Sequence, residues 1–329
     1  MHLSFCNIKK YELMQYEKVF YRFGRFLLAF VGLVLLLAAI LPYKKNGYMR
    51  EQEVKMAMLS APDRKPAVVL LGGSNVAFGY DSGMLSDSLG MPVVNAGLHA
   101  SVGLKYIIDD CFPRLRRGDI LVLSPEYGHF FGNMAYGEAP MTDLVYLSDF
   151  RLVHKLNWRQ LYSLMNNTPK YLRTKLEYTF LNTLPMAKDS VYSLSTFNEY
   201  GDVVAHWKHD ECRYSETLNP QPLGIWNSDF VFYLKNELCA LRKKGIYIIM
   251  CPPVVASTYY LNNRLNIEYA DSVLYSEGLP FVVPPLEAVY PDTLFYDTGY
   301  HLRRMGAKKH TESLIRILRR RIFIMADHR

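Results

Sequence analysis

Short apolar runs alternate with amphipathic segments along most of this chain. Five runs have the length of a buried β-strand: 68–71, 92–95, 120–123, 246–250 and 280–283. Helical periodicity fits the segments between and after them: 82–89, 103–115, 228–243, 262–277 and 303–323. Continuous apolar strands that alternate with helices are typical of a parallel sheet covered on both faces. The pattern therefore predicts an α/β fold.

The alternation stops between residues 128 and 225. This stretch is rich in Tyr, Leu and Asn, with helical patterns near 157–166 and 169–178. We expect an insertion between two βα units rather than a separate domain. Insertions of this kind, at the carboxyl ends of strands, often shape the substrate cleft of α/β proteins.

Residues 26–43 form an apolar run of 18 residues without a charged side chain. At about 1.5 Å per residue, a helix of this length reaches roughly 27 Å, close to the thickness of a bilayer core. Tyr21 and Tyr43 flank the run at positions that suit the two membrane interfaces. A buried core helix is rarely so uniformly apolar, and a cleavable signal peptide ends in small residues rather than in Pro-Tyr-Lys-Lys. We therefore predict one N-terminal transmembrane helix.

The charges on the two sides of this run predict its orientation. Five Lys and Arg side chains precede it and four follow closely. This excess favours a cytoplasmic N-terminus, so the rest of a single-pass protein would be periplasmic or extracellular. We divide the chain into a cytoplasmic leader over 1–25, the membrane helix over 26–43, a stalk over 44–65 and one domain over 66–329.

Composition narrows the classes of function. Half of the residues are hydrophobic, which excludes global disorder, and the net charge is +7. Basic residues gather at both ends without a nucleic-acid-binding motif, so we expect contact with membrane lipid or an acidic polymer and none with nucleic acid. The five cysteines form no CxxC pair, and no His/Cys cluster has metal spacing. We expect neither a metal nor another cofactor.

The most informative stretch is Gly72-Gly73-Ser74-Asn75, directly after the first apolar run. A serine on a tight glycine turn at a sheet edge is where an α/β enzyme can present a nucleophile, although such a stretch can also be only a turn. A nucleophilic serine needs a base and a group that orients the base. His301 would accept the Ser74 proton and Asp297 would hold the imidazole. The alternative is that Asp297 only caps the last helix.

These segments together resemble the SGNH/GDSL hydrolase superfamily. Gly73-Ser74-Asn75 fits the first block, Asn95-Ala96-Gly97 the second, Ser124-Pro125-Glu126-Tyr127 the third, and the stretch from Asp297 to His301 the last. The resemblance implies a three-layer α/β/α, flavodoxin-like parallel sheet, with Ser74 as nucleophile. It also implies that the Gly97 amide helps to form the oxyanion hole.

The chain departs from the family pattern at two positions. The acid precedes the histidine by four residues instead of three, so Thr298 occupies the usual acid position. Glu126 stands where the family has an asparagine that donates to the oxyanion, and an ionised carboxylate has no proton to donate. Either Asn75 or another group supplies the donor, or Glu126 points elsewhere, or the site is degraded.

The resemblance implies a membrane-tethered serine esterase or O-acyltransferase. Membrane-anchored members are similar in plan, including the alginate O-acetylation proteins and the D-alanyl transfer protein of teichoic-acid synthesis. The implied substrate is an acyl-modified envelope polysaccharide, and the implied partner is a multi-spanning membrane acyltransferase. Glu126 and the altered spacing favour the alternative, a non-catalytic glycan-binding or accessory subunit.

Overall fold

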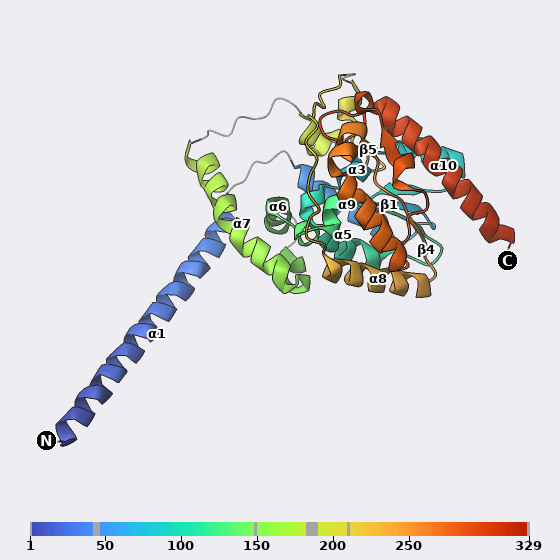
Figure 1. Cartoon of the computed structure of the whole chain (residues 1–329). Coiled ribbons are helices and arrows are strands. Elements are labelled where there is room, and N and C mark those ends of the chain that lie inside the picture. Colours follow the sequence, from blue (N-terminus) through green and yellow to red (C-terminus); the bar gives the residue numbers. More distant parts are fainter. Residues whose placement is uncertain (1, 42–46, 148–149, 182–189, 209–210, 328–329) are drawn as a thin grey trace. The chain divides into compact units, whose positions relative to one another are not determined.

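The computed structural model describes residues 2–41, 47–147, 150–181, 190–208 and 211–327 (Figure 1). The chain divides into two compact units, one of residues 1–44 with 168–185 and one of residues 45–167 with 186–329. The predicted insertion over 128–225 is therefore shared between the two units. Each unit is described separately below.

The first unit contains the long N-terminal helix α1, His2–Ile40. Its stretch Gln15–Leu37 has a mean hydropathy of 1.9 and is long and apolar enough to cross a membrane. Length and composition of this kind fit a transmembrane segment and also a signal sequence. The predicted leader is helical and continuous with the apolar run. The end of the predicted span, including Tyr43, lies outside the described residues.

The second unit contains a parallel sheet of four strands, which confirms the predicted α/β fold at this level. The strands are β1 Val68–Gly72, β2 Val93–Asn95, β3 Ile120–Ser124 and β4 Tyr247–Met250, in the order β2-β1-β3-β4. Gly72 pairs with Ser124 and Leu70 with Asn95, so the carboxyl ends of the three neighbouring strands meet at one edge. β1, β2 and β3 were predictable because each is buried throughout and therefore continuously apolar, and β4, at the end of the sheet, is apolar although partly exposed.

The predicted strand over 280–283 is wrong. The run makes one strand-like hydrogen bond to β4, in which the Val282 amide donates to the Met250 carbonyl at 2.8 Å. Pro280 and Pro284 bracket it and lack N–H groups, which limits the ladder it can form. A second, two-stranded parallel sheet forms instead, from β5 Val255–Ala256 and β6 Val289–Tyr290.

The expected helices of the second unit are present. They are α4 Ser82–Leu89, α5 Leu104–Cys111, α8 Ser228–Lys243, α9 Ser257–Ser276 and α10 Arg304–Asp327. Asp81 caps α4 by accepting a hydrogen bond from the Met84 amide at 3.0 Å, and Asn227 caps α8 in the same way. The two helical patterns near 157–178 form one helix, α7 Trp158–Leu176, which the two units share. Three further helices are α2 Glu51–Ser60, α3 Ser74–Ala77 and α6 Ala139–Leu147.

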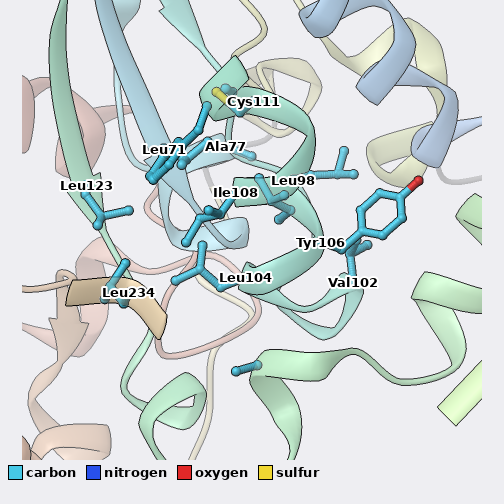
Figure 2. Packing of buried hydrophobic residues seen from close by; sticks show 14 of the residues in the cluster. Leu71, Ala77, Leu98, Val102, Leu104, Tyr106, Ile108, Cys111, Leu123 and Leu234 are labelled. Atoms are coloured by element: carbon cyan, nitrogen blue, oxygen red, sulfur yellow. The ribbon is translucent and has the colours of Figure 1, made fainter. Parts of the chain in front are cut away.

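Both faces of the sheet are buried along β1, β2 and β3, and the edge strand β4 is partly exposed. Alternate strand residues face two different apolar clusters, as the two-residue period requires. One cluster joins Leu71 and Leu123 to Ile108 of α5 and Leu234 of α8, and these side chains converge in Figure 2. The other joins Val68, Leu70, Ile120 and Val122 to side chains of α4 and α10, including Leu85, Leu314 and Leu318.

The segment predicted as a stalk packs into the second unit where the structure describes it. Met56 and Leu59 of α2 belong to the apolar core, and Lys55 is fully buried. The polar side chains of α2 are buried because they find distant partners: Gln52 donates to Asp110 at 2.9 Å and Lys55 to the Gly97 carbonyl. The local sequence pattern does not reveal such distant partners, so the polar side chains of α2 were predicted to be exposed to solvent.

Candidate active site

Ser74 lies where β1 passes into α3, at the carboxyl edge of the sheet. Gly72 ends the strand, Gly73 precedes the helix, and Ser74 is the first helical residue. A Cβ atom on Gly72 would lie 2.3 Å from the Ser124 carbonyl oxygen, and one on Gly73 would lie 2.5 Å from Glu126 Oε1. Gly72 is therefore required by the close approach of the neighbouring strand, and Gly73 leaves room for the Glu126 carboxylate and for Ala100.

The Ser74 hydroxyl is hydrogen-bonded to Glu126. Ser74 Oγ donates to Glu126 Oε1 at 3.1 Å, and the Asn75 amide donates to the same oxygen at 3.1 Å. Glu126 is 5% exposed and follows β3, so pairing of β1 with β3 brings its carboxylate beside Ser74. Of the alternatives left open by the sequence, Glu126 pointing elsewhere is excluded: it lies in the site.

The side chain of Asn75 is engaged and is not positioned as an oxyanion donor. Its Nδ2 donates to the Ser124 carbonyl at 3.0 Å and to Ser124 Oγ at 3.2 Å, and its Oδ1 accepts from the Gly73 amide at 3.1 Å. These bonds tie the end of β1 to the end of β3. In this structure the Asn75 side chain therefore links the two strand ends, and an oxyanion would have to compete with Ser124 for its N–H groups.

Gly97 also has a packing role, in the turn that follows β2. Its amide donates to Asn95 Oδ1 at 3.0 Å, within the turn that follows β2. A Cβ atom at this position would lie 2.6 Å from the Ala77 nitrogen and 2.7 Å from Val76 Cβ, so the glycine lets this turn pack against α3. In this structure Asn95 accepts the Gly97 N–H, so a substrate oxyanion would have to compete with Asn95 for that donor.

The structure brings Asp297 and His301 together. His301 Nδ1 and Asp297 Oδ1 are 2.7 Å apart. The Thr298 hydroxyl accepts hydrogen bonds from the amides of Tyr300 at 3.3 Å and His301 at 3.2 Å. This turn accommodates the extra residue in the spacing, so the carboxylate that contacts His301 is that of Asp297, and Thr298 shapes the loop.

Sequence reasoning missed the contribution of Tyr192, which lies in the insertion. Tyr192 Oη donates to Asp297 Oδ2 at 2.5 Å. Burial of Asp297 acts to raise its pKa, but the hydrogen bonds and charge of His301 and the hydrogen bond from Tyr192 outweigh it, so the pKa is lowered. Asp297 is therefore held as a carboxylate. The only sequence signal for this tyrosine was the high tyrosine content of the stretch over 128–225. No motif spacing pointed to this residue in particular.

The His301 ring and the Ser74 turn are joined through Phe78. Phe78 follows α3, and its amide donates to the Ser74 carbonyl at 2.9 Å. Its ring stacks on the His301 imidazole, with centroids 3.9 Å apart and planes inclined by 8°. Tyr300 makes a second link, because its hydroxyl accepts from the Tyr127 amide, next to Glu126, at 3.3 Å.

Ser74 and His301 share no hydrogen bond within the described part of the chain. The Ser74 hydroxyl is bonded to Glu126, and among the described side chains His301 Nε2 has no partner. His301 is nearly buried, with 7% of its side chain exposed. Asp297 therefore orients the imidazole, and His301 Nε2 has no partner among the described residues although the ring lies against the end of α3, the helix that carries Ser74.

The site contains no evident metal centre. Across the residues that the structure describes, no group of three or more His, Cys, Asp or Glu side chains could hold a metal ion. Comparison of the chain with family models, curated proteins and solved structures finds no match.

Proposed function

We propose that this chain is a membrane-tethered, SGNH-like serine esterase or O-acyltransferase that acts on an acyl-modified cell-envelope polysaccharide. The observation that carries the proposal is the Asp297–His301 hydrogen bond of 2.7 Å. The loop that holds this pair also contacts the end of the serine's helix, because the His301 ring stacks on Phe78, directly after α3. Burial of both sheet faces under helices supports the flavodoxin-like, three-layer arrangement of that superfamily. The apolar helix α1 supports tethering, and the excess of Lys and Arg before its apolar run favours a periplasmic or extracellular second unit.

In this mechanism Ser74 Oγ attacks the carbonyl carbon of an ester. His301 Nε2 accepts the serine proton, and Asp297 holds the other ring nitrogen and stabilises the imidazolium. The tetrahedral intermediate collapses, the alcohol leaves with that proton, and an acyl-enzyme remains. Water or a sugar hydroxyl then attacks the acyl group, giving hydrolysis or transfer. A multi-spanning membrane acyltransferase would supply the acyl group in the second case.

This mechanism requires Glu126 to move. Its Oε1 accepts from both the Ser74 hydroxyl and the Asn75 amide, which is where a substrate oxyanion would need its donors. When the carboxylate swings away, the Ser74 hydroxyl becomes available to His301 and the Asn75 N–H becomes available to the oxyanion. Glu126 thus holds the site in a closed arrangement that substrate binding would open.

The second candidate function is a non-catalytic glycan-binding or accessory subunit. The observation that favours it is the satisfaction of the donors around Ser74: the Asn75 side chain bonds to Ser124, the Gly97 amide to Asn95, and Ser74 to Glu126. A non-catalytic site forms no oxyanion hole, so all of these donors can be paired within the protein.

Labelling with a fluorophosphonate probe separates the two functions. The full-length protein in detergent should label on Ser74, and Ser74→Ala and His301→Ala should abolish labelling without lowering the melting temperature by more than a few degrees. Ser276→Ala, at the end of α9, is the matched control and should label like wild type. Equal labelling of wild type and Ser74→Ala would overturn the catalytic proposal and leave the accessory function.

A further inference from the structure

The second unit contains a surface groove that shares no residue with the candidate active site. It lies between residues 133–140 and the first turns of α7, and its volume is about 570 Å³. This volume lies within the range of small-molecule sites, roughly 300–1,000 Å³. Both walls come from the segment predicted as an insertion. The groove is thus the part of the insertion whose role the active site does not explain.

Exposed aromatic rings form one wall of the groove. Trp158 is 72% exposed and Tyr162, one helical turn later, is 69% exposed. Rings of this size are normally buried, and leaving them in water costs free energy. Tyr136 lines the groove below them, with the Arg159 guanidinium 4.9 Å above its ring and 5.3 Å from that of Trp158. The guanidinium stacks with both rings and holds this wall in place.

Polar side chains form another part of the lining, together with Gly137, Ala139 and Pro140. Ser163 Oγ donates to the Gly137 carbonyl at 2.7 Å, and Asn167 Nδ2 donates to the Ser163 carbonyl at 2.8 Å, which fixes α7 against the opposite wall. The side chains of Asn133 and Asn166 also line the groove and have no hydrogen-bond partner among the described residues. Amides offer both donors and acceptors, which suits a ligand that carries many hydroxyl groups.

The charges of the groove select against an anionic ligand. Arg159 forms an ion pair with Asp229, so its positive charge is already compensated. Glu138 adds an exposed carboxylate to the lining. An acidic polymer or an anionic lipid headgroup would therefore meet net negative charge here, whereas a neutral sugar would not.

We propose that this groove binds a neutral polysaccharide segment, with sugar rings stacked on Trp158 and Tyr162 and hydroxyl groups bonded to Asn133 and Asn166. The inference deepens the proposed function, on which it rests for the class of substrate: the groove would hold the polymer whose acyl groups Ser74 attacks. Binding itself requires no catalysis, so it can be measured separately.

The test is a titration of the full-length protein, in detergent and in phosphatidylcholine nanodiscs, with maltohexaose, cellohexaose and chitohexaose. Binding is followed by isothermal titration calorimetry, which needs no tryptophan as a reporter. At least one neutral oligosaccharide should bind, and Trp158→Ala and Tyr162→Ala should each weaken its binding roughly tenfold, the loss expected for an aromatic contact of about 1.4 kcal/mol. Tyr275→Ala removes an equally exposed ring on α9 and should not change affinity. Ser74→Ala should bind as wild type does.

Three outcomes would overturn the proposal: no binding of any hexasaccharide at millimolar concentration, unchanged affinity in both aromatic variants, or tighter binding of oligogalacturonate than of the neutral sugars. A fourth concerns the membrane. If Trp158 is shielded from iodide in nanodiscs before sugar is added, the ring faces lipid and the groove is not a sugar site.

Sugar binding without fluorophosphonate labelling would contradict the catalytic function alone, and labelling without sugar binding would contradict the groove alone.

Discussion

Two halves of the candidate active site meet in the second unit, and their hydrogen bonds differ in what they leave available. In the acid–base half, Asp297 orients His301 through Nδ1, and Nε2 has no partner among the described residues. In the serine half, the Ser74 hydroxyl and the Asn75 amide are both bonded to Glu126. The first half leaves one imidazole nitrogen available, and in the second half one carboxylate accepts from both donors.

This difference shows that a complete set of residue types does not make a complete site. Ser74, His301 and Asp297 are all present at the expected edge of the fold, and the acid–histidine contact forms. The orientation of the serine is decided by its strongest nearby acceptor, and that acceptor is Glu126. The four experiments below test the two halves and the turn after β2 that packs against α3, beginning with the largest expected effect.

Asp297→Asn should lower the rate of fluorophosphonate labelling by on the order of 10³-fold to 10⁴-fold. The amide cannot stabilise the imidazolium and favours the wrong ring tautomer. Labelling rates of the full-length variants measure the effect, with Asp87→Asn, an exposed carboxylate on α4, as the control. A loss smaller than tenfold would show that the acid–base half does not activate Ser74.

Gly97→Ala should destabilise the second unit by roughly 2–3 kcal/mol, because the new methyl group would overlap the backbone of α3. Thermal unfolding should show a clear fall in the melting temperature. Gly83→Ala is the matched control: its Cβ would lie 3.4 Å from the nearest atom, an ordinary contact, and should leave stability nearly unchanged. Equal melting temperatures for the two variants would contradict the packing role given to Gly97.

Acid should destabilise the acid–base half through His206, which packs against Phe78 and whose Nε2 lies 2.8 Å from the Leu302 carbonyl oxygen. Burial lowers the pKa of His206 to about 4. Between that value and the usual pKa near 6.5, the unfolded chain binds a proton that the folded chain does not, so stability falls as the pH is lowered. From pH 7 to pH 5 the loss should be on the order of 2 kcal/mol for this residue.

His206→Gln tests this assignment in the same unfolding experiment. The variant should reduce the dependence of stability on pH between 5 and 7, while His154→Gln, at an exposed histidine, should retain it. An unchanged pH dependence in His206→Gln would assign the acid sensitivity to other groups.

Glu126→Gln should raise the labelling rate by about tenfold, which corresponds to about 1.4 kcal/mol. The substitution keeps the shape of the side chain but removes a negative charge from the position of the developing oxyanion. It also weakens the hydrogen bond that holds the Ser74 hydroxyl. Ser74→Ala/Glu126→Gln is the control and should not label. A fall in labelling would mean that the Glu126 carboxylate assists Ser74, and the contrast between the two halves would have to be abandoned.

Sequence patterns succeeded where the deciding interaction is local. The four strands of the main sheet are short apolar runs that can be read directly from the sequence, and the Asp297–His301 pair lies within one short loop. They failed where the partner is distant in sequence. Lys55 is buried because it reaches the Gly97 carbonyl 42 residues away, and Tyr192 joins Asp297 across 105 residues.

The sequence by itself determined the parallel α/β core, the apolar N-terminal helix and the residues that gather at the carboxyl edge of the sheet. It did so because strand burial, helix length and glycine turns leave periodic or local signatures. Only the tertiary structure decided which donors at that edge are used. Hydrogen bonds of Ser74, Asn75 and Gly97 depend on how strand ends and turns meet in space, and the nearest acceptor in the fold takes them.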